Sequence, residues 1–217
     1  MRALIVLGGE APGKALLESC MRQSDLVIAA DRGLAAFDNA GLEPHCLIGD
    51  MDSVPKAVLE RHTGRLEQTR LNPVKDDTDA EAALHLAAER GANEVTFLGA
   101  LGGRLDHALA NVMLLNKAHQ LGVRAEILSE SVRIARVCGT ENLCGAKGDT
   151  VSLLPLGRAE GVTLTGFYYP LSGHTLTSDT SLGVSNVVVS DEAMIEVADG
   201  DLILFHYYAG DLQEFGR

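Results

Sequence analysis

Apolar runs and amphipathic helical stretches alternate over residues 1–128, and this alternation restricts the fold of that part more than any other feature of the chain. Several of the runs, such as residues 3–7 and 26–30, are continuously apolar, which is typical of strands buried on both faces. Such strands form a parallel sheet that is covered by helices on both sides. The expected strands are residues 3–7, 26–30, 46–48, 65–69, 94–98 and 124–128. The expected helices are residues 13–21, 34–40, 55–61, 79–90 and 106–121.

After about residue 129 glycine, threonine and valine become frequent and helical periodicity disappears. The short alternating runs are residues 132–137, 150–154, 161–164, 184–189, 193–197 and 202–205. Short strands between turn residues predict an antiparallel sandwich or barrel. The predicted fold class is therefore α/β, with an N-terminal doubly wound, mostly parallel sheet carrying helices on both faces in residues 1–128, followed by a C-terminal antiparallel β-sandwich or barrel in residues 129–217.

The charge of the chain excludes one class of partner. With 18 Lys and Arg against 30 Asp and Glu, the formal charge is −12. Nucleic acid is not expected as a partner, because binding through a phosphate backbone needs a basic surface. A small phosphorylated ligand remains compatible with this charge if a metal supplies positive charge.

The distribution of apolar residues and cysteines predicts the compartment. The chain has no stretch near twenty apolar residues, so we expect a cytoplasmic protein without a membrane anchor. Its 4 cysteines lack paired spacing, which favours reduced core thiols over zinc ligands or disulfides.

The first acidic loop contains Asp50 and Asp52, which follow Gly49 at the end of an apolar run. Two carboxylates held this close repel each other, and a cation offsets that repulsion. Oxygen ligands suit Mg²⁺. The alternative interpretation is a solvated Asp-x-Asp turn.

The second acidic loop is the Lys-Asp-Asp-Thr-Asp segment at residues 75–79. Thr78 and Glu81 have capping-box spacing, which makes Thr78 the expected N-cap of a helix. Asp79 then lies in the first turn, where the helix dipole alone could explain an acidic residue. Three carboxylates within four residues exceed what capping requires, and Lys75 beside them could hold a phosphate.

The third loop, residues 99–107, joins a strand to a helix through three glycines. Glycines permit close approach to a ligand, and amides at a helix start bind anions. Arg104 could bind a phosphate with two hydrogen bonds, and Asp106 is either a metal ligand or a helix cap. The loop is neither a dinucleotide fingerprint nor a P-loop.

These loops, together with residues 8–10 and 31–33, follow strands of the expected parallel sheet. Ligands bind beyond the carboxyl ends of such strands, so the segments should line one crevice. Carboxylates, a lysine, an arginine and a glycine-rich anion loop are the components of a phosphoryl-type transfer site.

Several segments resemble motifs of the thiamine pyrophosphokinases. Residues 49–53 resemble Gly-Asp-Phe-Asp-Ser, with Met51 in place of the aromatic residue, and residues 75–79 resemble Lys-Asp-x-Thr-Asp. Residues 102–107 resemble Gly-Gly-Arg-x-Asp-His, and residues 183–186 resemble Gly-x-Ser-Asn. Residues 30–33 are similar to Ala-Asp-Gly-Gly, although Arg32 stands where the family has glycine.

The resemblance implies an α/β nucleotide-binding domain, a thiamine-binding β-sandwich that also forms a homodimer, and transfer of diphosphate from MgATP to thiamine with release of AMP. It implies catalytic roles for Asp50, Asp52, Asp79 and Asp106. It implies that Asp50, Asp52 and Asp79 bind Mg²⁺. It implies contacts with ATP for Asp31, Lys75, Asp76, Thr78, Arg104 and His107. It implies contacts with thiamine for Ser185 and Asn186.

Several alternatives stay open. The chain has no tryptophan, so a ring that stacks on thiamine must come from Phe167, Tyr168, Tyr169 or a histidine, and the tyrosines could instead pack in the sandwich. Ser185 and Asn186 could form only a turn. Any of the three metal-site carboxylates could accept the proton of the attacking hydroxyl. Competing functions are a diphosphokinase acting on a hydroxymethyl pterin, a metal-dependent phosphohydrolase, and a non-catalytic nucleotide or thiamine sensor.

Overall fold

A computed structural model describes residues 1–62, 64–71 and 78–209 of the chain. The chain divides into two compact units, Met1–Glu130 and Ser131–Arg217. We call them the first and the second unit and describe each by itself.

The first unit contains a parallel sheet with the strand order β6-β5-β1-β2-β3-β4. Its strands are β1 (Arg2–Val6), β2 (Leu26–Ala30), β3 (Cys46–Gly49), β4 (Glu67–Arg70), β5 (Glu94–Leu98) and β6 (Arg124–Leu128). Its helices are α1 (Lys14–Arg22), the 3-10 turn η1 (Asp31–Gly33), α2 (Leu34–Ala40), α3 (Lys56–His62), α4 (Asp79–Glu89) and α5 (Leu105–Gln120). The expected strands and helices are thus confirmed, with ends that differ by at most two residues.

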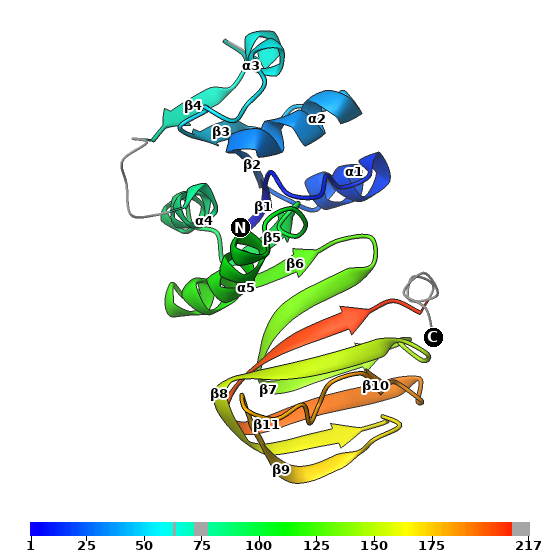
Figure 1. The fold of residues 1–217 in the computed structure, drawn as a ribbon. Coiled ribbons are helices and arrows are strands. Elements are labelled where there is room, and N and C mark those ends of the chain that lie inside the picture. Colours follow the sequence, from blue (N-terminus) through cyan, green and yellow to red (C-terminus); the bar gives the residue numbers. More distant parts are fainter. Residues whose placement is uncertain (63, 72–77, 210–217) are drawn as a thin grey trace. The chain divides into compact units, whose positions relative to one another are not determined.

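The chain reverses its direction across this sheet between β1 and β5. From β1 it proceeds through β2 and β3 to β4, and it then returns to place β5 on the other side of β1. Because crossovers between parallel strands are right-handed, helices α1 to α3 cover one face, and α4 and α5 cover the other (Figure 1). The connections leave β1 and β5 in opposite directions, which opens a crevice at the carboxyl ends of these two strands.

Burial on both faces explains why the central strands β1, β2 and β3 are almost continuously apolar. In β1, Leu4 and Val6 contact a core that contains Leu17 of α1 and Phe37 of α2. Ile5, between them, is also fully buried and faces the opposite side of the sheet. Each buried aliphatic side chain contributes about 1.5–3 kcal/mol of transfer free energy, so both faces stabilise the sheet.

The helix ends follow the expected capping chemistry. The Thr78 side chain accepts a hydrogen bond from the backbone N–H of Glu81 at 3.2 Å, which confirms the N-cap of α4. Gly41, Gly91 and Gly122 lie just beyond α2, α4 and α5 with φ of 70°, 87° and 74°. These left-handed conformations are the ones in which glycine ends a helix without a steric penalty.

The second unit consists of antiparallel strands, as predicted. They are β7 (Val132–Cys144), β8 (Thr150–Thr165), β9 (Leu171–Thr177), β10 (Asn186–Val187) and β11 (Glu192–Tyr207). β11 pairs with both β7 and β8, and β8 also pairs with β9 and β10. The buried core of this unit includes Val151, Leu153, Leu164, Leu176 and Ile195.

The strand lengths in the second unit correct the prediction. The expected runs 150–154 and 161–164 are one strand, β8, and the runs 193–197 and 202–205 are one strand, β11. Both strands bend near their middles (Figure 1), where the pairing register shifts and Gly161 and Gly200 have positive φ. The polar residues at these bends interrupt the apolar pattern. Strand β9 was not expected, and the run 184–189 contributes only the two residues of β10.

The four cysteines are free thiols in two different environments. Cys20 and Cys46 are buried, and burial raises the pKa of each thiol. Cys138 and Cys144 are exposed on β7, so the expectation of core thiols is wrong for these two. Among the residues that the structure describes, none of the helices combines the length and the hydrophobicity that a membrane crossing requires.

Candidate functional site

A cavity of about 820 Å³ lies in the first unit, at the carboxyl ends of the parallel strands. The loops after β1, β2, β3 and β5 line it, together with the first turns of α4 and α5. Asp31, Asp50, Asp79, Arg104 and Asp106 all line this one cavity. The crevice expected from the order of motifs is therefore present, and its lining is rich in carboxylates.

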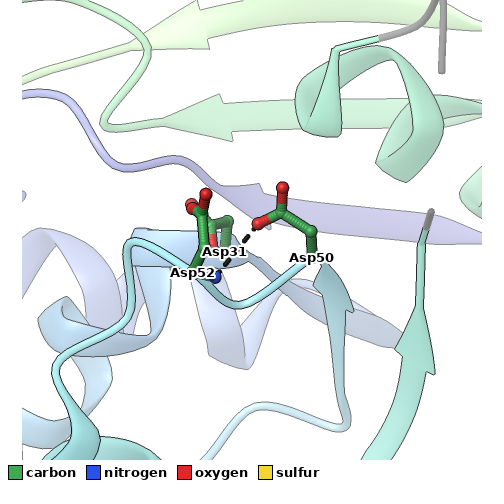
Figure 2. Close-up of side chains that lie close together, drawn as sticks. All are labelled: Asp31, Asp50 and Asp52. Carbon is green, nitrogen blue, oxygen red and sulfur yellow. Dashed lines mark hydrogen bonds between the residues drawn. The ribbon is translucent and has the colours of Figure 1, made fainter. Parts of the chain in front are cut away.

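Three carboxylates meet at one side of the cavity. One oxygen each from Asp31, Asp50 and Asp52 lies within 4.8 Å of the others (Figure 2). Asp31 follows β2 and the other two follow β3, the neighbouring strand. The backbone N–H of Asp52 donates to Oδ1 of Asp50 at 3.0 Å, which fixes the turn between them. The sequence placed Asp31 among the ATP contacts, whereas the structure groups it with the two aspartates of the central motif.

Unusual backbone geometry brings these loops together. Gly49 has φ of 146°, and a Cβ atom at this position would lie 3.0 Å from the Cβ of Asp31. Glycine therefore permits the close approach of the β2 and β3 ends. Asp31 and Met51 adopt φ of 47° and 67°, which side chains other than glycine rarely do.

The environment of the cluster favours the neutral form of two of its members. Burial raises the pKa of Asp31, although a hydrogen bond from the Ser53 hydroxyl opposes this shift. The hydrogen bond with Asp50 and the charge of that residue raise the pKa of Asp52. The charge of Asp79 raises both pKa values further. Among the residues that the structure describes, no cationic side chain is a main cause of either pKa shift.

The donor set fits a divalent cation. Oδ1 of Asp31 is buried and has no hydrogen-bond partner among the described residues, which is costly unless a ligand occupies the site. The other available donors are carboxylate oxygens of Asp50 and Asp52, and hard cations such as Mg²⁺ prefer oxygen ligands.

The second acidic loop contributes to the same cavity from the start of α4. Thr78 and Asp79 both line it, so the capping role of Thr78 and a position in the site occur together. Lys75, Asp76 and Asp77 lie outside the residues that the structure describes.

In the third loop, Arg104 and Asp106 form a two-point ion pair. Nε and Nη2 of Arg104 lie 3.1 and 2.5 Å from the two carboxylate oxygens of Asp106. This hydrogen bonding lowers the pKa of Asp106 to about 2. Asp106 also accepts from the backbone N–H of His107, as a residue in the first turn of a helix can. His107 lines the cavity as well.

Close packing of the two glycine-rich loops shapes the cavity floor. The N–H of Gly9 donates to the carbonyl oxygen of Gly99 at 2.8 Å, and a Cβ atom on Gly9 would lie 2.2 Å from the carbonyl oxygen of Leu101. Asn111 supports the third loop, residues 99–107, because its side chain donates a hydrogen bond to the carbonyl oxygen of Ala100 at 2.8 Å. Sequence reasoning missed Asn111, whose position one helical turn after His107 was the available signal.

A smaller cavity of about 130 Å³ lies within the second unit. Tyr169, Leu182 and Asn186 are among its lining residues. The Asn186 side chain is buried, and its Nδ2 donates to the carbonyl oxygen of Tyr169 at 2.7 Å while its Oδ1 accepts from the N–H of Tyr169 at 3.0 Å. Asn186 therefore holds the segment that carries Tyr169.

Ser185 and the aromatic residues occupy distinct positions near this cavity. Ser185 is exposed and has φ of 58°, and its N–H donates to the Ser152 hydroxyl. Tyr168 and Tyr169 expose about two thirds of their surface, 65% and 63%, so they do not pack in the core. Phe167 is buried there instead.

Comparisons with known proteins indicate the same family for both parts of the chain. Residues 17–127 match the family model described as thiamin pyrophosphokinase, catalytic domain, and residues 138–202 match thiamin pyrophosphokinase, vitamin B1 binding domain. A thiamine pyrophosphokinase of Bacillus subtilis is 28% identical over 187 residues, which cover 82% of this chain and 86% of that protein.

Solved structures are similar over almost the whole chain. Thiamin pyrophosphokinase from Geobacillus thermodenitrificans has a TM-score of 0.82 at 28% identity and covers 97% of this chain and 99% of its own. The enzyme from Candida albicans has a TM-score of 0.83 at 14% identity, covers 95% of this chain and 88% of its own, and supports the fold alone.

Proposed function

The chain belongs to the thiamine pyrophosphokinase family, and from this premise we propose that the cavity of the first unit is where its reaction takes place. Members of the family transfer a diphosphate group from ATP to thiamine, which gives thiamine diphosphate and AMP. The observation that carries the proposal is the cluster of Asp31, Asp50 and Asp52 beside a cavity with glycine-rich walls. Metal-assisted phosphoryl transfer needs such carboxylates together with an anion-binding loop.

The carboxylates would hold Mg²⁺. Asp50, Asp52 and Asp79 are the ligands expected from the sequence, and Asp31 would join them through its buried Oδ1 atom. Asp79 lines the same cavity and would act as a ligand or beside the reacting groups. When bound, Mg²⁺ would neutralise charge on the phosphate oxygens of ATP.

The remaining residues of the cavity would position ATP. Amides of the loop with Gly102 and Gly103 face a ligand without obstruction from side chains, and Arg104 offers guanidinium donors to phosphate. Thr78 and His107 line the same space. Asp106 orients Arg104 through their two hydrogen bonds. From its place in the cavity wall, Asp106 would also contact the metal or the phosphates of ATP. Lys75 and Asp76 complete the expected ATP contacts.

The chemistry requires an acceptor oxygen in line with the bond that breaks. The hydroxyethyl oxygen of thiamine attacks the β-phosphorus of ATP. The bond between the β-phosphorus and the oxygen that it shares with the α-phosphate breaks, and AMP leaves with the electron pair of that bond. A carboxylate among Asp50, Asp52 and Asp79 accepts the proton of the hydroxyl. We assign thiamine recognition to the second unit, where Ser185 and Asn186 lie in and beside the segment that forms the small cavity.

The second unit would also form a homodimer. Tyr168, Tyr169, Val184 and Val189 are exposed on it, and such apolar surface favours an interface between proteins. A cytoplasmic location, where ATP is plentiful, belongs to the same proposal.

One incubation tests the proposed function. The protein with MgATP and thiamine should yield AMP and thiamine diphosphate in equal amounts, measured by chromatography of the products. ADP with thiamine monophosphate would contradict the reaction type. Phosphate release without an acceptor would indicate a phosphohydrolase, and a faster reaction with a hydroxymethyl pterin would change the acceptor.

A further inference from the structure

Arg32 lies on the wall of the large cavity but belongs to none of the roles described so far. It follows Asp31 in the turn η1 and is exposed. A Cβ atom on Gly8 would lie 2.8 Å from the Cβ of Arg32. The stem of the arginine therefore lies directly against the loop after β1, in space that the glycine leaves free.

The position of Arg32 complements that of Arg104. In the sheet, β1 lies between β2 and β5, so the loop after β1 separates the loops that carry the two arginines. Gly8 and Gly9 of that central loop line the cavity. An extended ligand that lies over this loop would therefore have the guanidinium of Arg32 on one side and that of Arg104 on the other.

The two arginines differ in how their charge is used. Arg104 is held by Asp106, whereas Arg32 makes no ion pair with any other described residue. The cavity wall also carries Asp31, Asp50 and Asp79, which repel a polyphosphate. A guanidinium that the described carboxylates leave unpaired offsets this repulsion, and it matches the geometry of phosphate oxygens.

We propose that Arg32 is a phosphate-binding residue of this cavity and holds the triphosphate chain of ATP from the β2 side, opposite Arg104. This inference rests on the proposed function, because it takes ATP as the ligand. It adds a contact that the family resemblance does not supply, since the resembling motif has glycine where this chain has Arg32.

The test compares nucleotides that differ only in their phosphates. Affinities of the full-length protein for MgATP, MgADP, AMP and adenosine are measured by titration calorimetry, for the wild type and for Arg32→Gln. Loss of charge-assisted hydrogen bonds should weaken MgATP binding about 10-fold to 100-fold and leave adenosine binding unchanged. Arg32→Lys keeps the positive charge but not the two parallel N–H donors of a guanidinium. Its affinity for MgATP should lie between those of the wild type and Arg32→Gln.

Two further variants serve as controls. Arg32→Gly introduces the residue of the family motif and should show the same loss of MgATP affinity as Arg32→Gln, so the comparison still holds if one of the two variants folds poorly. Arg124→Gln removes an exposed arginine at the amino end of β6, at the opposite edge of the sheet, and should leave every affinity unchanged.

The outcomes separate this inference from the proposed function. Unchanged MgATP affinity in the Arg32 variants, with a wild type that makes thiamine diphosphate, would overturn the role of Arg32 alone. Equal losses for adenosine and MgATP would show that Arg32 has only a structural role, which overturns the inference. A wild type that binds MgATP but makes no thiamine diphosphate would refute the proposed function, while the nucleotide comparison would still decide the role of Arg32.

Discussion

Asp31, Met51 and Ser185 are the described residues other than glycine with positive φ, and each belongs to a segment that resembles a family motif. Such conformations cost about 1–3 kcal/mol each and persist only where the surroundings enforce them. In the first unit, the adjacent ends of β2 and β3 hold the backbone in these conformations, and they bring the carboxylates of Asp31, Asp50 and Asp52 together. The strain is therefore concentrated where the proposed chemistry takes place.

Asp52→Ala is expected to reduce turnover by about a hundredfold or more, because the proposed metal site loses one ligand. The fold should be retained, since the substitution removes a carboxylate that is repelled by Asp50. Rates of AMP formation and thermal unfolding of the same preparations measure both effects. Asp191→Ala, at an exposed position of the second unit, is the matched control. Near-normal turnover in the Asp52 variant would remove this residue from the site.

At the scale of elements, the turn η1 packs tightly against β1. A Cβ atom on Gly33 would lie 2.0 Å from the carbonyl oxygen of Val6, which is buried backbone that cannot move away freely. Gly33→Ala is therefore expected to lower the free energy of unfolding by about 3 kcal/mol or more. Gly41→Ala introduces only an unfavourable φ, with no atom within 4 Å, and should cost about 1 kcal/mol. Urea unfolding measures both, and equal losses would refute the packing argument.

Helices α2 and α3 are joined by an ion pair with a defined pH dependence. Nε and Nη2 of Arg61 lie 2.8 and 2.5 Å from the Asp38 carboxylate, and Nε2 of His62 lies 3.4 Å from it. The hydrogen bonds from Arg61 lower the pKa of Asp38 below its ordinary value. Stability from this pair is present above the unfolded pKa, about 3.9, and is lost as the pH falls through the folded-state pKa.

Asp38→Asn should accordingly be less stable than the wild type at pH 7, and the difference should shrink below about pH 4. Free energies of unfolding in urea at several pH values give this comparison, with Asp191→Asn as the control. A difference that grows toward acid pH would contradict the assignment of the lowered pKa to the folded state.

At the scale of the whole molecule, our proposal places the reaction in the first unit and the dimer interface on the second unit. In the second unit the segments with Tyr168 and Val189 are neighbours, since the N–H of Tyr168 donates to the carbonyl oxygen of Val187 and the N–H of Val189 donates to that of Gly166. Both side chains are exposed. We therefore expect both side chains to belong to the interface of the proposed dimer.

The double variant Tyr168→Lys and Val189→Lys should be monomeric in analytical ultracentrifugation at concentrations where the wild type is dimeric. Leu109→Lys with Met113→Lys alters exposed apolar residues on α5 of the first unit and should leave the dimer intact. If only the α5 variant dissociates, the interface belongs to the first unit instead.

Local patterns in the sequence determined the secondary structure of the first unit and the residues available to its site. Continuous apolar runs marked the buried strands, Thr78 and Gly41 marked helix ends, and the acidic loops were identified because each follows a strand. These features depend on residues close together in the chain, so they can be read without the fold.

Tertiary structure alone decided which distant residues meet. Asp31 joins Asp50 and Asp52 because β2 and β3 are neighbours, and Arg32 and Arg104 flank one loop because β1 lies between β2 and β5. In the second unit the bends of β8 and β11 arise from pairing with other strands, which local patterns do not reveal. Strand order and register result from packing of the whole chain, and for that reason the sequence by itself supplied the site's residues but not their arrangement.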